Sequence, residues 1–150
     1  MGFNIVLLEP EIPMNTGNIG RLSLASGSKL HLVKPFGFNL DDKRLKRAGL
    51  DYWKHVTVEI YEDKDEFFLK NRGEKMVYFS SSSTKDYCSI KYEDNMFFIF
   101  GKESVGLSKE IISKNFDKIF KIPIHSKYIR SLNLANAVSI VVYEGLRSLK

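Results

Sequence analysis

The stretch I-P-I-H-S-K-Y-I-R-S-L-N-L-A-N-A-V-S-I-V-V-Y-E-G-L-R-S-L, from Ile122 to Leu149, is the most informative part of this 150-residue chain. An apolar strand end meets a proline, and a polar, basic loop follows. Arg130, Ser131 and Asn133 then gather before a strongly apolar helix. Ser and Asn side chains accept hydrogen bonds from the free N–H groups of a helix start, which also attracts anions. The stretch is either a well-capped helix after a turn or a loop that binds a ligand, a phosphate or both.

Outward from this helix, strand-like and helix-like segments alternate along the whole chain. The alternation predicts an α/β fold with a mostly parallel sheet and helices on both faces. The length fits one domain, spanning residues 1–150. We expect strands at 3–8, 30–33, 56–60, 76–79, 96–100 and 118–122, and helices at 16–26, 41–49, 64–69, 108–113 and 134–149.

Charge and composition limit the classes of function that the chain could have. The net charge of +5 and the pI of about 9.2 favour an anionic partner such as nucleic acid, although a merely soluble basic protein would look the same. The single cysteine, Cys88, fits a reducing cytoplasm and is expected to be a buried or incidental thiol. The three histidines lack metal-ligand spacing, so we expect no metal. We expect neither a membrane span nor a secretory signal.

The last helix is apolar on most of its surface. One stripe carries Leu134, Val138, Val141, Val142 and Leu149, and Ala137, Ile140 and Tyr143 make much of the rest apolar. A helix of this kind is normally buried from several directions. In so small a domain, a subunit interface would achieve that burial, which predicts a homodimer.

Two segments that follow predicted strands carry candidate chemistry. The segment E-P-E-I-P-M-N-T-G-N-I-G-R, residues 9–21, is neither a dinucleotide-binding nor a Walker motif. By itself it is typical of a strand-to-helix turn that carries polar side chains. In F-F-I-F-G-K-E-S-V-G-L-S, residues 97–108, Gly101 would let a ligand approach the backbone and Glu103 could orient a hydroxyl, an amine or an arginine. The alternative is a turn with a solvated glutamate.

Two further segments have equally plain alternatives. The serine run Ser80–Ser83 lies at the end of a predicted strand, at the edge where open α/β sheets bind ligands. It either contributes to a ligand site there or is a flexible turn. The segment D-D-K-R-L-K-R-A-G-L-D-Y-W, residues 41–53, offers cations for phosphates and Tyr52 and Trp53 for stacking on bases. It is otherwise a solvated helix face.

In this order and spacing, the motifs N-T-G-N-I-G-R, D-D-K-R-L-K-R-A-G-L-D-Y-W, F-G-K-E-S-V-G-L and I-P-I…R-S-L-N-L-A-N-A-V resemble the SPOUT superfamily of RNA methyltransferases. Within it they resemble the small tRNA 2′-O-methyltransferases that modify the wobble nucleotide, the TrmL-like group. The resemblance implies an α/β fold with a C-terminal trefoil knot and a homodimer. It also implies S-adenosylmethionine as methyl donor, S-adenosylhomocysteine as product, and the anticodon loop of a tRNA, such as a leucine tRNA, as substrate.

The resemblance also assigns roles to residues. It implies a catalytic centre of Arg21, Asn15, Glu103, Ser131 and Asn133. It implies cofactor contacts from Ser80, Gly101, Leu107, Ile122, Ser131 and Leu132. Candidate RNA contacts are Arg21, Lys43, Arg44, Lys46, Arg47 and Arg130. Another tRNA or ribosomal RNA position, or a non-catalytic RNA-binding module of the same fold, remain alternatives.

Arg21 has a predicted role that follows from its chemistry. A ribose 2′-hydroxyl is a very weak acid, so methylation requires its proton to leave or its developing charge to be stabilised. Arginine is almost never deprotonated, and its guanidinium binds phosphate in a bidentate manner. We therefore expect Arg21 to act first as an electrostatic clamp on the hydroxyl or the adjacent phosphate, with a direct base role left open.

Overall fold

A six-stranded parallel sheet forms the centre of the molecule. The computed structural model describes residues 2–41 and 43–150, and all of their side chains except those of residues 46 and 48–51. The strand order is β3-β2-β1-β5-β4-β6, and every pairing within the sheet is parallel. The strands are β1 (Asn4–Leu8), β2 (Lys29–Val33), β3 (Val58–Tyr61), β4 (Met76–Phe79), β5 (Phe97–Phe100) and β6 (Ile119–Phe120).

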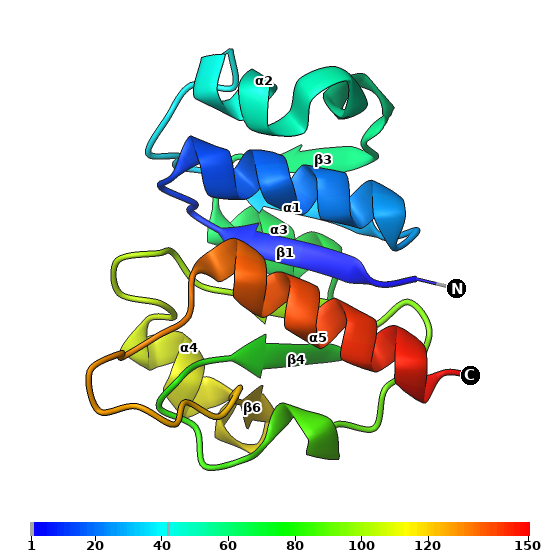
Figure 1. Cartoon of the computed structure of the whole chain (residues 1–150). Coiled ribbons are helices and arrows are strands. Elements are labelled where there is room, and N and C mark those ends of the chain that lie inside the picture. The colour runs from blue at the N-terminus through cyan, green and yellow to red at the C-terminus, as the bar shows by residue number, and fades with distance from the viewer. Residues whose placement is uncertain (1, 42) are drawn as a thin grey trace.

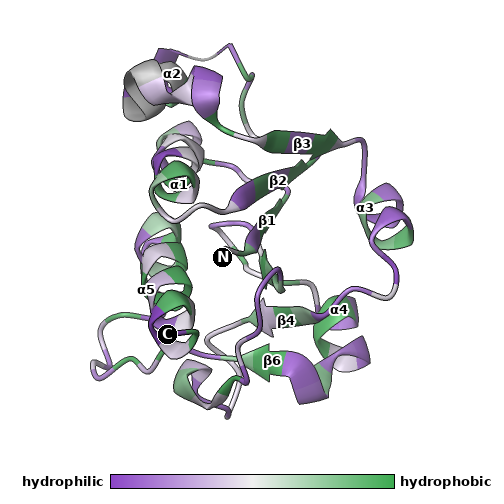
Figure 2. Cartoon of the chain, turned by 90° about the vertical axis from the view of Figure 1, so that its right-hand side faces the viewer, coloured by the Kyte–Doolittle hydropathy of each residue, from purple (hydrophilic) through white to green (hydrophobic). Residues whose placement is uncertain are grey.

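The helices cover both faces of this sheet, as predicted. Figure 2 shows α1, α2 and α5 on one side and α3 and α4 on the other. Figure 1 shows α1 and α5 running beside each other. The helices are α1 (Pro13–Ala25), α2 (Lys43–Gly49), α3 (Lys64–Lys70), α4 (Lys109–Lys114) and α5 (Leu134–Ser148), with short 3-10 turns at Leu50–His55, Tyr87–Ser89 and Phe116–Lys118.

Buried strand residues alternate between two hydrophobic clusters, one on each face of the sheet. Along β5, Phe98 joins the cluster beneath α1 and α5, whereas Phe97 and Ile99 join the cluster beneath α3 and α4. Successive strand side chains point to opposite faces, so a strand covered on both sides must be apolar at every position. The continuous apolar run of β5 therefore results from its place in the middle of the sheet.

Several predicted boundaries were wrong by two or three residues, including the start of β3, which lies at Val58 and not at Val56. The first helix begins at Pro13 and not at Thr16, because proline suits the first helical position, where its missing N–H costs no hydrogen bond. β6 holds only Ile119 and Phe120, because the next residue, Lys121, leaves the sheet and bonds to the backbone of Lys85 and Tyr87. Of the two residues predicted to open the second helix, Asp41 lies in a turn before α2 and Asp42 lies outside the described residues.

The structure bears on alternatives that the sequence left open for two side chains. Cys88 is exposed, which rules out the buried alternative and is compatible with an incidental thiol. Trp53 packs against α1, where a Cβ added to Gly20 would lie 2.6 Å from its ring, and it is therefore not free to stack on a base.

Candidate functional site

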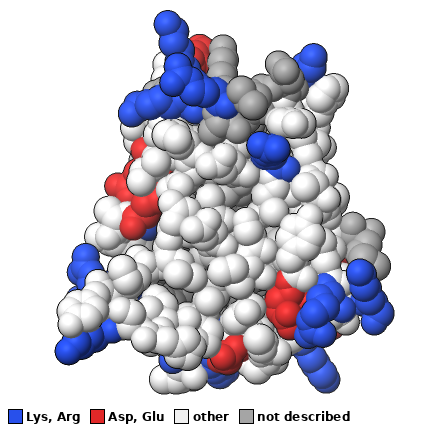
Figure 3. Space-filling view, viewed as in Figure 1, with Lys and Arg blue, Asp and Glu red and all other residues white. Residues whose placement is uncertain are grey.

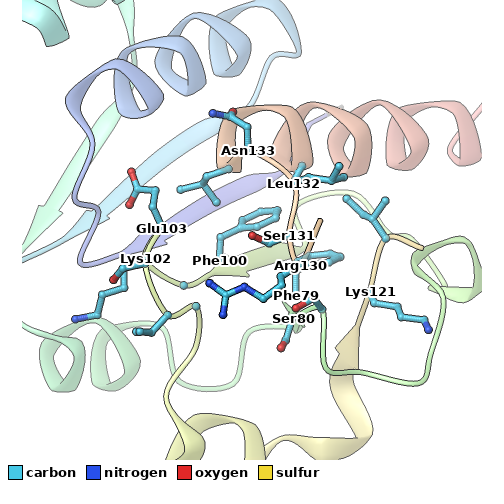
Figure 4. A pocket seen from close by; sticks show the side chains of 18 of the residues that line it. Phe79, Ser80, Phe100, Lys102, Glu103, Lys121, Arg130, Ser131, Leu132 and Asn133 are labelled. Atoms are coloured by element: carbon cyan, nitrogen blue, oxygen red, sulfur yellow. The ribbon is translucent and has the colours of Figure 1, made fainter. Parts of the chain in front are cut away.

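A pocket opens where β4, β5 and β6 end. Its volume is about 670 Å³, and it receives Ser80 from the end of β4, Gly101 from the end of β5 and Ile122 from beyond β6. Arg130, Ser131 and Leu132, which precede α5, line its other side (Figure 4). The carboxyl ends of parallel strands are where open α/β sheets bind ligands, so the fold itself places these segments together.

The apolar part of the pocket is built from the last residue of three strands. Phe79, Phe100 and Phe120 end β4, β5 and β6, and all three line the pocket. The rings of Phe79 and Phe100 stack with centroids 4.8 Å apart and an interplanar angle of 13°. Together with Phe120, Ile122 and Ile124 they form the apolar part of the pocket lining.

Glu103 holds the start of α1 against the loop that follows β5. One carboxylate oxygen accepts the backbone N–H of Glu11 at 2.8 Å, and the other accepts the N–H of Ile12 at 2.8 Å. In return, Glu11 Oε1 accepts the N–H of Ser104 at 2.8 Å, and this bond lowers the pKa of Glu11 below its usual value. The two glutamates form a reciprocal clamp, which we call the Glu11–Glu103 clamp.

Two asparagines extend this clamp to α5. The Asn15 amide donates to Glu103 Oε2 at 3.3 Å, and the Asn133 amide donates to Asn15 Oδ1 at 3.1 Å. Asn133 Oδ1 caps α5 by accepting the N–H of Asn136. Three segments far apart in sequence are therefore joined by one chain of hydrogen bonds, which fixes the pocket wall on the side of α1.

Gly101 is required for the loop itself. A Cβ added there would lie 2.1 Å from the Gly106 carbonyl carbon and 2.3 Å from the Leu107 nitrogen. The backbone of the same loop, and not a ligand, fills the space beside this glycine. The sequence predicted a close approach of a ligand to the Gly101 backbone, whereas in the structure the protein's own loop backbone makes this approach.

The charges around the pocket are mostly positive. Lys102, Lys121 and Arg130 line it, against Glu103, whose carboxylate is committed to backbone N–H groups. The Arg130 side chain projects across the pocket mouth in Figure 4. Within the described residues, neither Arg130 nor the Ser131 hydroxyl has a hydrogen-bond or ion-pair partner, so both are available to a ligand.

The structure brings most of the sequence-predicted site residues together. The pocket is lined by Asn15, Ser80, Gly101, Glu103, Ile122, Arg130, Ser131, Leu132 and Asn133. Leu107 does not line it, because its side chain is buried in the cluster beneath α3 and α4. Only its backbone nitrogen, packed against Gly101, lies near the site.

Arg21 lies outside the pocket of its own chain. It is exposed in the third turn of α1, with its guanidinium carbon 5.0 Å from the centroid of the Tyr52 ring. Lys43, Arg44 and Arg47 are exposed on α2, which packs on α1, and Figure 3 shows Lys and Arg gathered over that helix. The side chain of Lys46 lies outside the described residues.

Sequence reasoning missed several pocket residues, including Phe79, Phe100, Phe120, Lys102 and Lys121. Phe79 and Phe100 carried a usable signal, because each is the final apolar residue of a predicted strand, whereas the predicted strand that contains Phe120 was extended to Ile122. The lysines carried none, because a lysine beside a strand end is indistinguishable in sequence from a solvated one. No cluster of three or more His, Cys, Asp or Glu side chains that could hold a metal occurs in the described part of the chain, and no helix there is long and apolar enough to cross a membrane.

Comparison with known proteins gives full-length similarity. Residues 2–143 match the SpoU rRNA Methylase family. The chain is 42% identical over 147 residues to the tRNA (cytidine(34)-2′-O)-methyltransferase of Escherichia coli (strain K12), covering 97% of this chain and 93% of that protein. It is 44% identical over 148 residues to the protein of the same name from Saccharophagus degradans, covering 98% and 96%.

Solved structures agree with this similarity. A structure described as "Structural insights into the 2-OH methylation of C/U34 on tRNA" is 38% identical, with a TM-score of 0.93 and coverage of 98% of this chain and 95% of that one. An AdoMet-bound rRNA methyltransferase from Sinorhizobium meliloti, 24% identical, has a TM-score of 0.88 and covers 99% and 57%. The latter shows likeness in fold.

Proposed function

The chain belongs to the SpoU rRNA methylase family, and from this premise we propose that it is a tRNA 2′-O-methyltransferase. It transfers a methyl group from S-adenosylmethionine to the ribose 2′-oxygen of cytidine or uridine at position 34, the wobble nucleotide, of a tRNA such as a leucine tRNA. The observation that carries the proposal is the pocket at the ends of β4, β5 and β6, tied through Glu103, Asn15 and Asn133 to α1 and α5. Residues from three of the four motifs that carry the family resemblance line this pocket, and the segment 41–53 does not.

The residues of the pocket fit this cofactor. Its volume of about 670 Å³ is in the range of small-molecule sites. The Phe79–Phe100 surface suits an adenine ring, backbone groups near Ser80 and Ile122 suit its polar edge, and Arg130 or Lys121 suits a carboxylate. When bound, S-adenosylmethionine supplies a methyl group on a positively charged sulfur.

The protein residues divide into contacting and positioning groups. Ser131 and Arg130 have no partner within the described residues and are free to contact the ribose hydroxyl and a neighbouring phosphate. Glu103, Asn15 and Asn133 already bond to one another or to backbone, so they hold the walls that set the approach of the hydroxyl. Methyl transfer requires in-line alignment, so fixing this geometry is the main contribution of the protein.

Nucleoside mass spectrometry tests the reaction directly. Incubation with S-adenosylmethionine and a tRNA transcript bearing C34 or U34 should yield the 2′-O-methylated nucleoside at that position, whereas a transcript with a purine at 34 serves as control. Methylation of a base atom would contradict the proposal. Methylation at another tRNA position or in ribosomal RNA would favour the nearer alternative, and RNA binding without S-adenosylmethionine binding would favour a non-catalytic module.

The exposed face of α1 and α5 supports a homodimer. Met14 on α1 and Ile140 and Tyr143 on α5 are 53%, 37% and 48% exposed. Figure 3 shows that the middle of this face carries few charged side chains. We propose that a second copy covers it. Tyr143→Glu should give a monomeric mass by light scattering, whereas Leu69→Glu, at an exposed apolar site on α3, should leave the dimer intact.

A dimer also accounts for the position of Arg21. Met14, Asn18 and Arg21 are spaced so that they share one exposed stripe of α1. In the proposed dimer this stripe lies at the boundary between subunits, where Arg21 can serve the pocket of the partner subunit. Arg21→Ala should then retain S-adenosylmethionine binding and lose ~10²–10³ in rate, as for loss of one transition-state contact.

Subunit mixing distinguishes action across the interface from action within one chain. Arg21→Ala and Ser131→Ala homodimers should each be inactive. After the two are unfolded and refolded together, half of the dimers would be mixed, and each would hold one intact site, which restores about a quarter of wild-type activity. Recovery of no activity would show that Arg21 acts within its own chain.

The remaining parts of the proposal rest on the same family membership. Residues 1–150 are proposed to act as one domain, and both subunits of the proposed dimer are expected to contact the tRNA. We propose a cytoplasmic location, because the proposed substrate is a tRNA. The C-terminal trefoil knot is inferred from the resemblance to knotted methyltransferases.

A further inference from the structure

The segment between β6 and α5 is poorly tied to the rest of the protein. From residue 122 to residue 132, the described structure contains a single hydrogen bond, from the Tyr128 N–H to the Ser126 hydroxyl at 3.1 Å. By contrast, the serine loop after β4 is bonded to β6 through Ser80 and Ser83. Figure 1 shows the segment as a long loop that projects beside the ends of β4 and β6.

The tip of this loop exposes apolar and aromatic surface. Tyr128 is 84% exposed and Ile129 is 52% exposed, and Tyr128 has the most exposed side chain among the large hydrophobic residues that the structure describes. The Lys127 ammonium lies 5.3 Å from the centroid of the Tyr128 ring. An exposed aromatic ring beside a cation is the combination that proteins use to stack on unpaired nucleobases while contacting the adjacent phosphate.

The tip is close to the pocket but is not part of it. Arg130, Ser131 and Leu132 line the pocket, whereas Lys127, Tyr128 and Ile129 do not. The side of the molecule where this loop lies carries Lys and Arg beside uncharged surface in Figure 3. A nucleotide whose ribose reaches Ser131 therefore has a neighbouring nucleotide within reach of the tip.

We propose that Tyr128 and Ile129 form a stacking platform for an unpaired base next to the target nucleotide in the RNA, with Lys127 contacting the intervening phosphate. The inference rests on the proposed function, because it identifies how that site selects its substrate. It predicts that the protein prefers a target within a single-stranded loop, since only an unpaired neighbour can leave its stack to meet Tyr128.

Three single variants test the platform against a tRNA with C34. Tyr128→Ala should weaken RNA binding by between about 5-fold and about 150-fold, the range that corresponds to loss of one base stack. Tyr128→Trp should bind as wild type or tighter. Phe116→Ala removes a ring that is also highly exposed, at the opposite end of β6, and should leave RNA affinity unchanged.

The salt dependence separates stacking from charge. Tyr128→Ala should leave the slope of log affinity against log salt unchanged, whereas Lys127→Ala should reduce it by ~0.7–0.9, as expected for one lost phosphate contact. Calorimetry with S-adenosylmethionine should give wild-type affinity for Tyr128→Ala, because Tyr128 does not line the pocket.

Several outcomes would overturn the platform. An unchanged RNA affinity in Tyr128→Ala, with wild-type methylation intact, would refute the platform and leave the proposed function standing. Loss of S-adenosylmethionine binding in that variant would assign the loop to the cofactor instead, and conversion to a monomer would make it a subunit contact. A wild-type protein that neither binds nor methylates the tRNA would refute both proposals.

Discussion

Glu103→Gln should destabilise the fold as well as the reaction, because the Glu103 carboxylate uses both oxygens as acceptors. Oε1 accepts the Glu11 N–H, and Oε2 accepts the Ile12 N–H and the Asn15 amide. The glutamine amide keeps one acceptor oxygen and places an N–H₂ group against the remaining donors. At least one charge-assisted hydrogen bond is lost, and a donor faces a donor.

The size of this effect follows from the surroundings of these bonds. A hydrogen bond to a charged group contributes ~1.5–3 kcal/mol, and the Glu103 side chain is only partly buried, so water replaces part of the loss. We expect a decrease of ~2 kcal/mol in the free energy of unfolding. For a domain of this size, that shifts the urea midpoint by about 1 M and the Tm by about 4–8 °C.

Urea unfolding monitored by circular dichroism measures this change in the free energy of unfolding. The slope of that free energy against urea concentration should be the same for both proteins. Glu110→Gln is the matched control, because Glu110 pairs with Lys114 in an exposed i,i+4 arrangement whose loss should leave the midpoint unchanged. If Glu103→Gln unfolds at the wild-type urea concentration, the carboxylate does not hold the start of α1. Wild-type stability with lost activity would then assign Glu103 to the reaction alone.

Three other substitutions or conditions have defined outcomes. The pKa of His31, which is buried beside Tyr61, is lowered by burial from 6.5 to about 4. As the pH falls, the unfolded chain therefore binds the proton first, and urea titrations should show the free energy of unfolding decreasing by up to about 3 kcal/mol from pH 6.5 to pH 4. A His31→Phe variant with the same pH dependence would contradict this. Val141 is fully buried on α5, so Val141→Ala should lower the free energy of unfolding by ~2 kcal/mol in the same assay. A decrease no larger than that caused by a substitution at an exposed site would be inconsistent with this burial. Gly101→Ala should reduce S-adenosylmethionine affinity in calorimetry because its Cβ collides with the loop backbone at Gly106, and an unaltered affinity would show that the loop can yield.

Much of the fold follows from local pattern. Within the described residues, strands and helices alternate as the sequence predicts, except that only the 3-10 turn at Tyr87–Ser89 separates β4 from β5. A parallel sheet requires a crossover connection between successive strands. The start of α1 was misplaced although Pro13, at its first position, is a local signal. The hydrogen bonds that also hold this start run to Glu103, about 90 residues away, and a contribution that depends on tertiary packing has no local signature.

The proximity of several predicted site residues is seen in the structure, whereas their roles stay predictions. Family resemblance placed Asn15, Glu103, Ser131 and Asn133 in one centre, and the structure brings all four to the pocket wall. Whether a carboxylate is free for chemistry depends on which donors surround it, and that is set by tertiary packing. The position of Arg21 outside its own pocket could not be anticipated either, because a helical residue's orientation depends on where the helix packs.

The position of β1 has a consequence for synthesis of the chain. β1 is the first strand to be made and one of the two central strands, yet it pairs with β5, which follows about 90 residues later. At ~5–20 residues per second, the ribosome needs roughly 5–20 s to supply that partner. During this interval β2 can protect one edge of β1, while the other edge, with Ile5, Val6 and Leu7, remains open to other nascent chains. A chain interrupted before residue 97 would therefore aggregate through this edge, and chaperone demand should be highest for messages stalled between β4 and β5.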